Sequence, residues 1–133
     1  MKSGLIKTFR DLLVWQKAFD LCVEIYRLSG EFPRHELYGL SSELRKTSRS
    51  VVCNIAEGHK RRSTREYIHF LRIAAGSEAE LESQILLSER LGYIQNETAE
   101  GIRRRLAEIE RMLAALIRSL TSRLAGPPQP PIP

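Results

Sequence analysis

The sequence predicts an all-α protein folded as an antiparallel up-down-up-down four-helix bundle. Apolar residues recur at spacings of three and four along four long segments, a pattern that is typical of amphipathic helices. Three short connectors join these segments, and helices with short connectors pack most simply as antiparallel neighbours. No segment shows the alternation of apolar and polar residues that a half-buried strand requires.

The first two predicted helices are delimited by glycine and proline. The first begins near Asp11 and ends before Gly30 and Pro33, which both disfavour helix. Its apolar positions are Leu12, Trp15, Ala18, Phe19, Cys22, Ile25 and Tyr26. The second begins near Glu36, and its apolar positions are Leu37, Leu40, Leu44, Thr47, Val51 and Ile55. Small residues on its face would let another helix approach closely: Ser41, Ser48, Ser50 and Cys53.

The third and fourth predicted helices are the longest. The third runs from Thr64 to Leu91 and is ended by Gly92; Gly76 interrupts it, and we expect a close helix crossing there. Asn96 is expected to cap the fourth helix. The apolar positions of the fourth helix are Ala99, Ile102, Leu106, Ile109, Leu113, Leu116 and Leu120.

Residues 54–66 form the turn between the second and third helices, where one apolar-periodic segment ends, basic residues follow and the next segment begins. We expect Gly58 to take the left-handed conformation that closes a helix. Ser63 with Glu66 three residues later has the spacing of a capping box. Glu57 lies where the helix dipole disfavours an anion, so we expect Lys60, Arg61 or a partner surface to hold it.

Length and composition indicate one domain. The chain has 133 residues, of which 42% are hydrophobic and 28% charged, as in ordinary globular proteins. No run approaches the roughly 18 to 20 apolar residues of a membrane span, and no signal peptide is evident. We expect a cytoplasmic protein with no membrane association, built from a basic arm (residues 1–10), the four-helix bundle (11–125) and a Pro-rich tail (126–133). Pro127 and Pro130 have P-x-x-P spacing, but a solvated extended tail is favoured over a ligand for an aromatic groove.

Positive charge gathers at one end of the predicted bundle, which we call the basic end. It comprises residues 1–17, 57–66 and 115–124, which together hold ten basic and three acidic residues, a net charge of +7. The whole chain carries +5, so the remainder carries −2. A basic surface of this kind is expected to bind phosphate backbones. The candidate nucleic-acid-binding residues are Lys7, Arg10, Lys60, Arg61, Arg62, Arg65, Arg118 and Arg123.

Two other charged or polar features favour structural interpretations. The run Arg103–Arg105 is expected to form a solvated helix face, with Glu100 and Glu108 spaced to pair with Arg104. Cys22 and Cys53 are interpreted as small buried hydrophobes, because no second cysteine or histidine stands at metal-ligand spacing.

No catalytic constellation is evident, so we predict a protein that is not an enzyme. Glu66 and His69 have the Glu-x-x-His spacing of di-metal bundles, but such bundles need this pair twice together with further glutamates. No serine or cysteine is paired with a histidine and an acid as nucleophilic catalysis requires, and no Gly-rich phosphate loop occurs. We expect no metal and no cofactor.

Several motifs resemble those of a known family, the bacterial four-helix-bundle proteins encoded in intervening sequences of 23S ribosomal RNA genes. The resemblance covers roughly residues 9–120. The motifs are Leu13-Val14-Trp15-Gln16-Lys17-Ala18, Phe32-Pro33-x-x-Glu36-Leu37-Tyr38-Gly39-Leu40, Asn54-Ile55-Ala56-Glu57-Gly58, Phe70-Leu71-x-Ile73-Ala74-x-Gly76-Ser77-x-x-Glu80-Leu81 and Leu91-Gly92-Tyr93-Ile94. The family often has Ser-Ile-Pro-x-Asn where this chain has Ser50-Val51-Val52-Cys53-Asn54, so a proline kink should be absent.

The resemblance implies a homopentamer. It also implies a relation to the accessory variability determinant of diversity-generating retroelements, a basic pentamer that binds nucleic acid and a reverse transcriptase. We therefore expect a homo-oligomer that binds nucleic acid, RNA in preference to DNA, as an accessory factor, with a reverse transcriptase as a further partner. Expected oligomer or inter-helix residues are Asn54, Glu57, Gly58, Gly76, Ser77 and Glu80. Expected interface residues outside the intrachain core are Leu37, Tyr38, Ile73 and Ile94.

The alternative is a structural or protein-binding scaffold oligomer with no role in nucleic-acid binding. In that case the arginines of the basic end would be solvated. A phosphate-driven complex weakens steeply with added salt, whereas an apolar protein interface does not, so a salt titration separates the two.

Overall fold

The computed structural model describes residues 5–126 and shows the predicted all-α fold. Lys2 and the P-x-x-P tail, Pro127 to Pro133, lie outside the described residues. The elements are the 3-10 helices η1 (Phe9–Asp11) and η2 (Arg34–Glu36) and the α-helices α1 (Leu13–Ser29), α2 (Leu40–Lys60), α3 (Thr64–Arg90) and α4 (Asn96–Ala125). None of these helices is long and apolar enough to cross a membrane.

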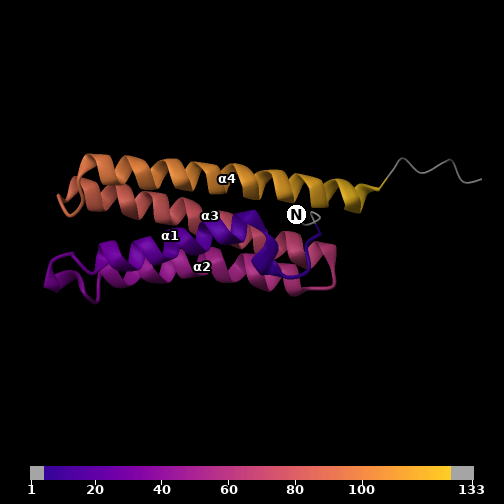
Figure 1. Ribbon diagram of the computed structural model, residues 1–133, viewed down its shortest axis with the longest axis horizontal. Helices are drawn as coiled ribbons and strands as arrows, with labels where there is room; N and C mark the ends of the chain where they lie inside the picture. The colour runs from indigo at the N-terminus through magenta and orange to yellow at the C-terminus, as the bar shows by residue number, and fades with distance from the viewer. Residues whose placement is uncertain (1–4, 127–133) are drawn as a thin grey trace, which may run out of the picture.

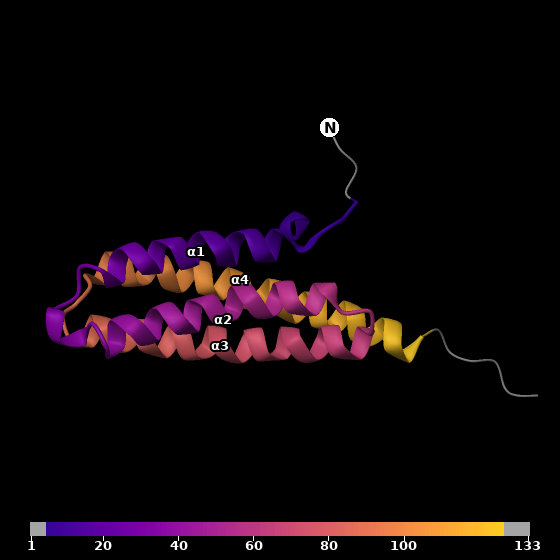
Figure 2. The same cartoon turned by 90° about the horizontal axis from the view of Figure 1, so that it is seen from below.

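The four α-helices lie side by side and alternate in direction along the chain (Figures 1 and 2). Packing joins α1 to α2, α2 to α3, α3 to α4 and α4 back to α1. Each helix therefore has two neighbours, as at the corners of a square. The start of α1, the α2–α3 turn and the end of α4 lie at one end of the molecule, and η2 and the α3–α4 turn lie at the other (Figure 1).

The core confirms the predicted stripes of α2 and α4 almost position for position, but α1 is rotated from the prediction. Its buried positions are Val14, Ala18, Leu21 and Ile25, whereas Phe19 is 45% exposed and Tyr26 is 36% exposed. The first helix carries apolar residues around more than one face, so spacing alone did not decide which face packs inward. Ile94, expected at a subunit interface, is instead only 7% exposed and belongs to the core of the bundle.

The glycine predictions at Gly58 and Gly76 were both wrong. Gly58 is buried inside α2 and has no positive φ. A Cβ at Gly58 would lie 2.9 Å from Phe70 Cβ and 3.1 Å from Tyr67 Cδ1, so this glycine permits the close approach of α3. A Cβ at Gly76 would meet nothing within 4 Å. The glycine that permits a close approach of α2 and α3 is therefore Gly58, at the end of α2, and not Gly76.

Helix ends follow the predicted signals in part. The Ser63 hydroxyl accepts a hydrogen bond from the Glu66 amide at 3.3 Å and caps α3, and Gly92, with φ of 84°, follows the end of α3. Asn96 is the first residue of α4 and not its cap; its amide donates to the Glu89 carboxylate at 2.7 Å. The Ser63 cap and Gly92 thus mark the start and the end of α3.

The start of α2 is capped by a side chain from η2. Glu36 Oε1 accepts from the Leu40 amide at 3.0 Å, and Glu36 Oε2 accepts from the Tyr93 hydroxyl at 2.8 Å. These two hydrogen bonds, the first more than the second, lower the pKa of the Glu36 carboxyl. Tyr93 also packs on Phe32, with ring centroids 5.2 Å apart. This cluster closes the end of the bundle opposite the basic end.

Candidate nucleic-acid interface

The three segments of the predicted basic end do lie at the same end of the molecule. The α2–α3 turn and the last turns of α4 are neighbours there, and η1 lies beside them at the start of α1 (Figures 1 and 2). The basic residues that the sequence singled out are therefore brought to one region from distant parts of the chain. Their individual surroundings differ: some of these basic side chains are engaged within the protein, and others are open to a ligand.

Arg61 is engaged within the protein. Its guanidinium lies 2.5 Å from a Glu57 carboxylate oxygen and 3.7 Å from a Glu66 oxygen. It also stacks over the Phe70 ring, 4.8 Å from the centroid. Arg61 therefore fastens the end of α2 to the start of α3, and it answers the question of what holds Glu57.

The other basic residues of this turn are available to a ligand. Lys60, Arg62 and Arg65 are exposed, and within residues 5–126 no ion pair is formed by any of them. Three unpaired cations on one short turn attract an anion more strongly than any of them alone. This turn is the centre of the candidate interface.

The N-terminal segment contributes less free charge than its composition suggested. Thr8 and Asp11 form a capping box around η1, and the Phe9 ring packs edge-on against Trp15 with centroids 5.1 Å apart. Lys7 and Arg10 are exposed beside this anchor. Lys17, which was counted with the basic end, pairs with Glu108 at 3.3 Å. Lys7 and Arg10 thus remain as candidate contacts, whereas Lys17 is a bridge between α1 and α4.

The end of α4 adds Arg118 and Arg123 and reveals a residue that sequence reasoning missed. Arg118 and Arg72 line one shallow depression between α3 and α4, together with Ile117, Thr121, Ser122 and Ala125. Arg72 follows exposed Arg65 at a spacing of seven, which places both on one face of α3. That spacing was the signal by which Arg72 could have been found. Arg123 lies near Tyr67; burial raises the pKa of the Tyr67 hydroxyl, and the Arg123 charge opposes this rise.

The second basic run of α4 is not part of this surface. Arg103 approaches Glu82 at 3.9 Å. The expected pairing of Arg104 with Glu100 or Glu108 is not formed, and Glu108 pairs instead with Lys17. The run thus forms a mixed-charge helix face, with acidic and basic residues side by side.

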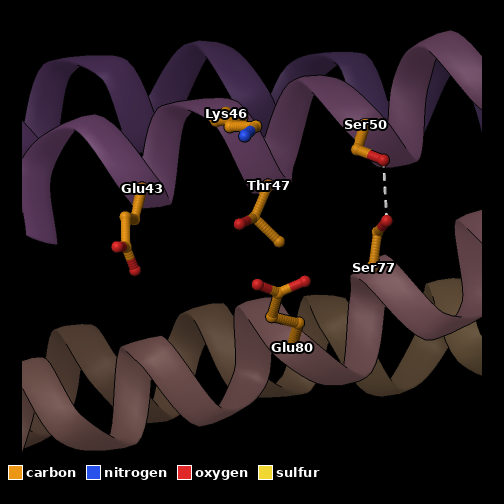
Figure 3. A pocket seen from close by; sticks show the side chains of 6 residues that line it. All are labelled: Glu43, Lys46, Thr47, Ser50, Ser77 and Glu80. Atoms are coloured by element: carbon orange, nitrogen blue, oxygen red, sulfur yellow. Dashed lines mark hydrogen bonds between the residues drawn. The ribbon is translucent and has the colours of Figure 1, made fainter.

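Among the remaining motif residues, Ser77 joins α3 directly to α2. The Ser50 and Ser77 hydroxyls are 2.7 Å apart (Figure 3). Asn54 Nδ2 donates to the Ser50 carbonyl at 2.8 Å. Gln84 Nε2 donates to Glu80 at 3.5 Å. Ser77 and Glu80 therefore face the groove between α2 and α3, whereas the hydrogen bond of Asn54 lies within α2.

An apolar groove between α1 and α2 is a further exposed feature. Its lining residues are Phe19, Cys22, Val23, Tyr26, Arg49, Val52 and Cys53. The Arg49 guanidinium donates to the Tyr26 hydroxyl at the edge of the groove. Cys53 is exposed here, contrary to the expectation of burial, because it faces away from the core on the same side as the outward face of α1.

The described residues hold no group of three or more His, Cys, Asp or Glu side chains arranged to bind a metal. Glu66, one half of the Glu-x-x-His pair, is turned to Arg61 instead. His69 is exposed and packs edge-on against Phe70, with ring centroids 5.4 Å apart.

Comparison with known proteins agrees with the fold. The sequence model described as "23S rRNA-intervening sequence protein" matches residues 10–115. Among solved structures, the chain is similar to a protein of unknown function from the S23 ribosomal protein family of Bacteroides thetaiotaomicron. The sequences are 26% identical with a TM-score of 0.75, and the match covers 80% of this chain and 96% of that one. No curated protein matches the sequence.

Proposed function

Because the chain belongs to the 23S rRNA-intervening sequence protein family, we propose that it is a non-enzymatic homo-oligomeric bundle that binds nucleic acid through its basic end. RNA is favoured over DNA, since the family name refers to ribosomal RNA. The observation that carries the proposal is the turn after α2, where Lys60, Arg62 and Arg65 are exposed and unpaired within the described residues. The proposed location is the cytoplasm.

The chemistry of the proposed interface favours contacts with phosphates. Lysine and arginine side chains bind phosphate oxygens, and the release of counterions drives such binding. Among residues 5–126 the candidate contacts are lysine and arginine side chains at helix ends and in a turn, which suit phosphate contacts that carry no sequence information. Binding is therefore expected to depend on the shape and charge of the nucleic acid more than on its sequence.

Assembly would increase the strength of these contacts. The apolar groove of α1 and α2, together with exposed Leu37, Tyr38 and Ile73, offers surface that a second copy could cover. In a pentamer with roughly parallel helix axes, five copies of the α2–α3 turn would form one ring. Several weak contacts made at once give an avidity that no single contact provides.

The second candidate function is a scaffold oligomer that binds proteins alone. The apolar groove favours it independently of the basic end, because such a groove is suited to a protein surface. The reverse transcriptase and the relation to retroelement accessory proteins, which the resemblance implied, stay predictions under either candidate.

A salt series tests the proposal. Binding of a structured RNA and of a DNA duplex with the same sequence is measured for the wild type and for the variant Lys60→Ser/Arg62→Ser/Arg65→Ser. Arg61 is left in place because it fastens α2 to α3. Each lost phosphate contact reduces the magnitude of the slope of log K against log salt by about 0.7 to 0.9, so we expect a reduction of about 2 to 3 for each subunit that contacts the nucleic acid.

The matched control removes the same charge at the opposite end of the bundle. Arg27, Arg34 and Arg90 are exposed there and form no ion pair within the described residues. The variant Arg27→Ser/Arg34→Ser/Arg90→Ser should keep the wild-type slope. Equal loss in both variants would show that net charge alone matters. If the wild type does not bind nucleic acid at near-physiological salt, the nucleic-acid role is refuted and the scaffold oligomer remains as the candidate function.

A further inference from the structure

A polar groove lies between α2 and α3, away from the basic end. Six residues line it, in the first half of α2 and the middle of α3, and its volume is about 320 Å³. They are Glu43, Lys46, Thr47, Ser50, Ser77 and Glu80. The inter-helix bond between Ser50 and Ser77 closes one side of the groove (Figure 3).

Thr47 is the residue that most clearly points to a ligand. Its side chain extends from α2 into the groove towards Glu80 (Figure 3), although the residue is only 6% exposed. Within residues 5–126, no hydrogen bond joins its hydroxyl to another group. Although most of the residue is buried, its hydroxyl oxygen stays open to the groove, so a ligand that enters the groove can donate a hydrogen bond to it. The neighbouring Ser50 and Ser77 hydroxyls, by contrast, satisfy each other.

Two carboxylates flank this hydroxyl. Glu43 reaches into the groove from α2 and Glu80 from α3 (Figure 3). Neither forms an ion pair with any described residue. Gln84 donates weakly to Glu80 at 3.5 Å and holds it from the next turn of α3. The groove thus offers two negative charges and a free acceptor hydroxyl, against one positive charge on Lys46.

We propose that this groove binds an ammonium or guanidinium group carried on a slender alkyl chain. Such a group supplies several N–H donors with positive charge, which matches two carboxylates and a hydroxyl acceptor. Glu43 and Glu80 provide the charge partners, and Thr47 accepts a hydrogen bond at the floor of the groove. A metal ion fits less well, because the described residues place no third acidic, histidine or cysteine ligand here and Lys46 lines the same groove.

The first experiment measures binding of the probe butylguanidinium to the full-length protein by amide NMR at low salt. Saturable shifts are expected at Thr47, Ser77 and Glu80. The variant Glu43→Gln/Glu80→Gln should weaken binding at least about tenfold, since two charge-assisted hydrogen bonds are lost. The matched control Glu31→Gln/Glu97→Gln makes the same charge change at exposed positions outside the groove and should bind as the wild type does.

The variant Thr47→Val separates binding from folding. Valine has nearly the same shape as threonine but no hydroxyl, so the variant should be at least as stable as the wild type while binding the probe several-fold more weakly. The proposal fails if Glu43→Gln/Glu80→Gln binds butylguanidinium as tightly as the control Glu31→Gln/Glu97→Gln does. It also fails if the amide shifts of the wild type never saturate.

A second measurement identifies where the cation comes from. Sedimentation equilibrium compares the assembled mass of the wild type and of Glu43→Gln/Glu80→Gln. If the variant dissociates and butylguanidinium dissociates the wild type, the occupant is a lysine or arginine of a second copy. If assembly is unchanged while the probe binds, the occupant is a free alkyl cation. The site requires neither nucleic-acid binding nor the basic end, so its failure would leave the proposed function untouched.

Discussion

Glu78 should make the bundle less stable as pH rises, and replacing it with glutamine should remove that dependence. Glu78 lies on α3, is 3% exposed, and faces Glu110 of α4 and Glu82 of its own helix. Burial, with smaller contributions from Glu110 and Glu82, raises the pKa of its carboxyl from 4.5 to about 7. The native protein therefore holds this proton at pH values where the unfolded chain has lost it.

The sign and the magnitude follow from these two pKa values. Below pH 4.5 the carboxyl is protonated in both states and carries no penalty. Between pH 4.5 and about 7 the unfolded state ionises first, so the free energy of unfolding falls as pH rises. One pKa unit corresponds to 1.36 kcal/mol, so the full penalty above pH 7 is about 3 kcal/mol.

Urea unfolding of the wild type and of Glu78→Gln at pH 5, 6, 7 and 8 measures this effect. At pH 8 the variant should be the more stable by up to about 3 kcal/mol, and at pH 5 the difference should shrink to about 1 kcal/mol. Protein concentration is held constant, so that association contributes equally to every measurement.

Two further variants locate the cause. Glu110→Gln removes one neighbouring charge, so it should lower the pKa of Glu78 and reduce the penalty in part. Glu31→Gln is exposed and should track the wild type at every pH to within about 0.5 kcal/mol. A difference between Glu78→Gln and the wild type that stays constant from pH 5 to 8 would refute the reasoning.

Three other substitutions should change the stability of the fold: two glycine substitutions in opposite directions, and one tyrosine substitution in a pH-dependent way. Gly58→Ala should destabilise the protein by about 1 to 3 kcal/mol in thermal or urea unfolding, because its Cβ would meet Phe70 at 2.9 Å. Gly76→Ala should stabilise it by about 0.5 to 1 kcal/mol, because the site is open and alanine favours helix; the reverse order would contradict the assigned crossing. Tyr93→Phe removes a hydrogen bond that lowers the pKa of Glu36. The ionised carboxylate stabilises the fold above pH 4.5 and loses this effect as pH falls through its lowered pKa, so the variant's stability deficit should be larger at pH 7 than at pH 3. An equal deficit at both pH values would show that the hydrogen bond to the ionised form is not responsible.

The helices themselves could be predicted from the sequence because their signals are local. The three-and-four spacing of α4 and the Ser63 cap each depend on residues within a few positions of one another. The face of α1 could not be predicted in this way. Phe19 and Tyr26 have the same spacing as core residues, and only contact with α2 and α4 selects Val14 and Leu21 instead.

The basic end was predictable as a region but not residue by residue. Charge counting found the segments, and the antiparallel topology brought them together. It did not distinguish Arg61, which is held by Glu57, Glu66 and Phe70, from its exposed neighbour Arg62. That distinction depends on side chains from both α2 and α3, which no single segment contains.

By itself the sequence determined the number of helices, their approximate ends and the polarity of charge along the bundle, because periodicity and capping act over one or two turns. The tertiary structure decided which glycine admits a neighbouring helix, which arginines of the α2–α3 turn are paired and which hydroxyl faces the groove between α2 and α3. At Gly58, Arg61 and Thr47 the outcome depends on the relative rotation and separation of two packed helices. Those quantities result from packing the whole bundle, so they become visible only once every helix is in place.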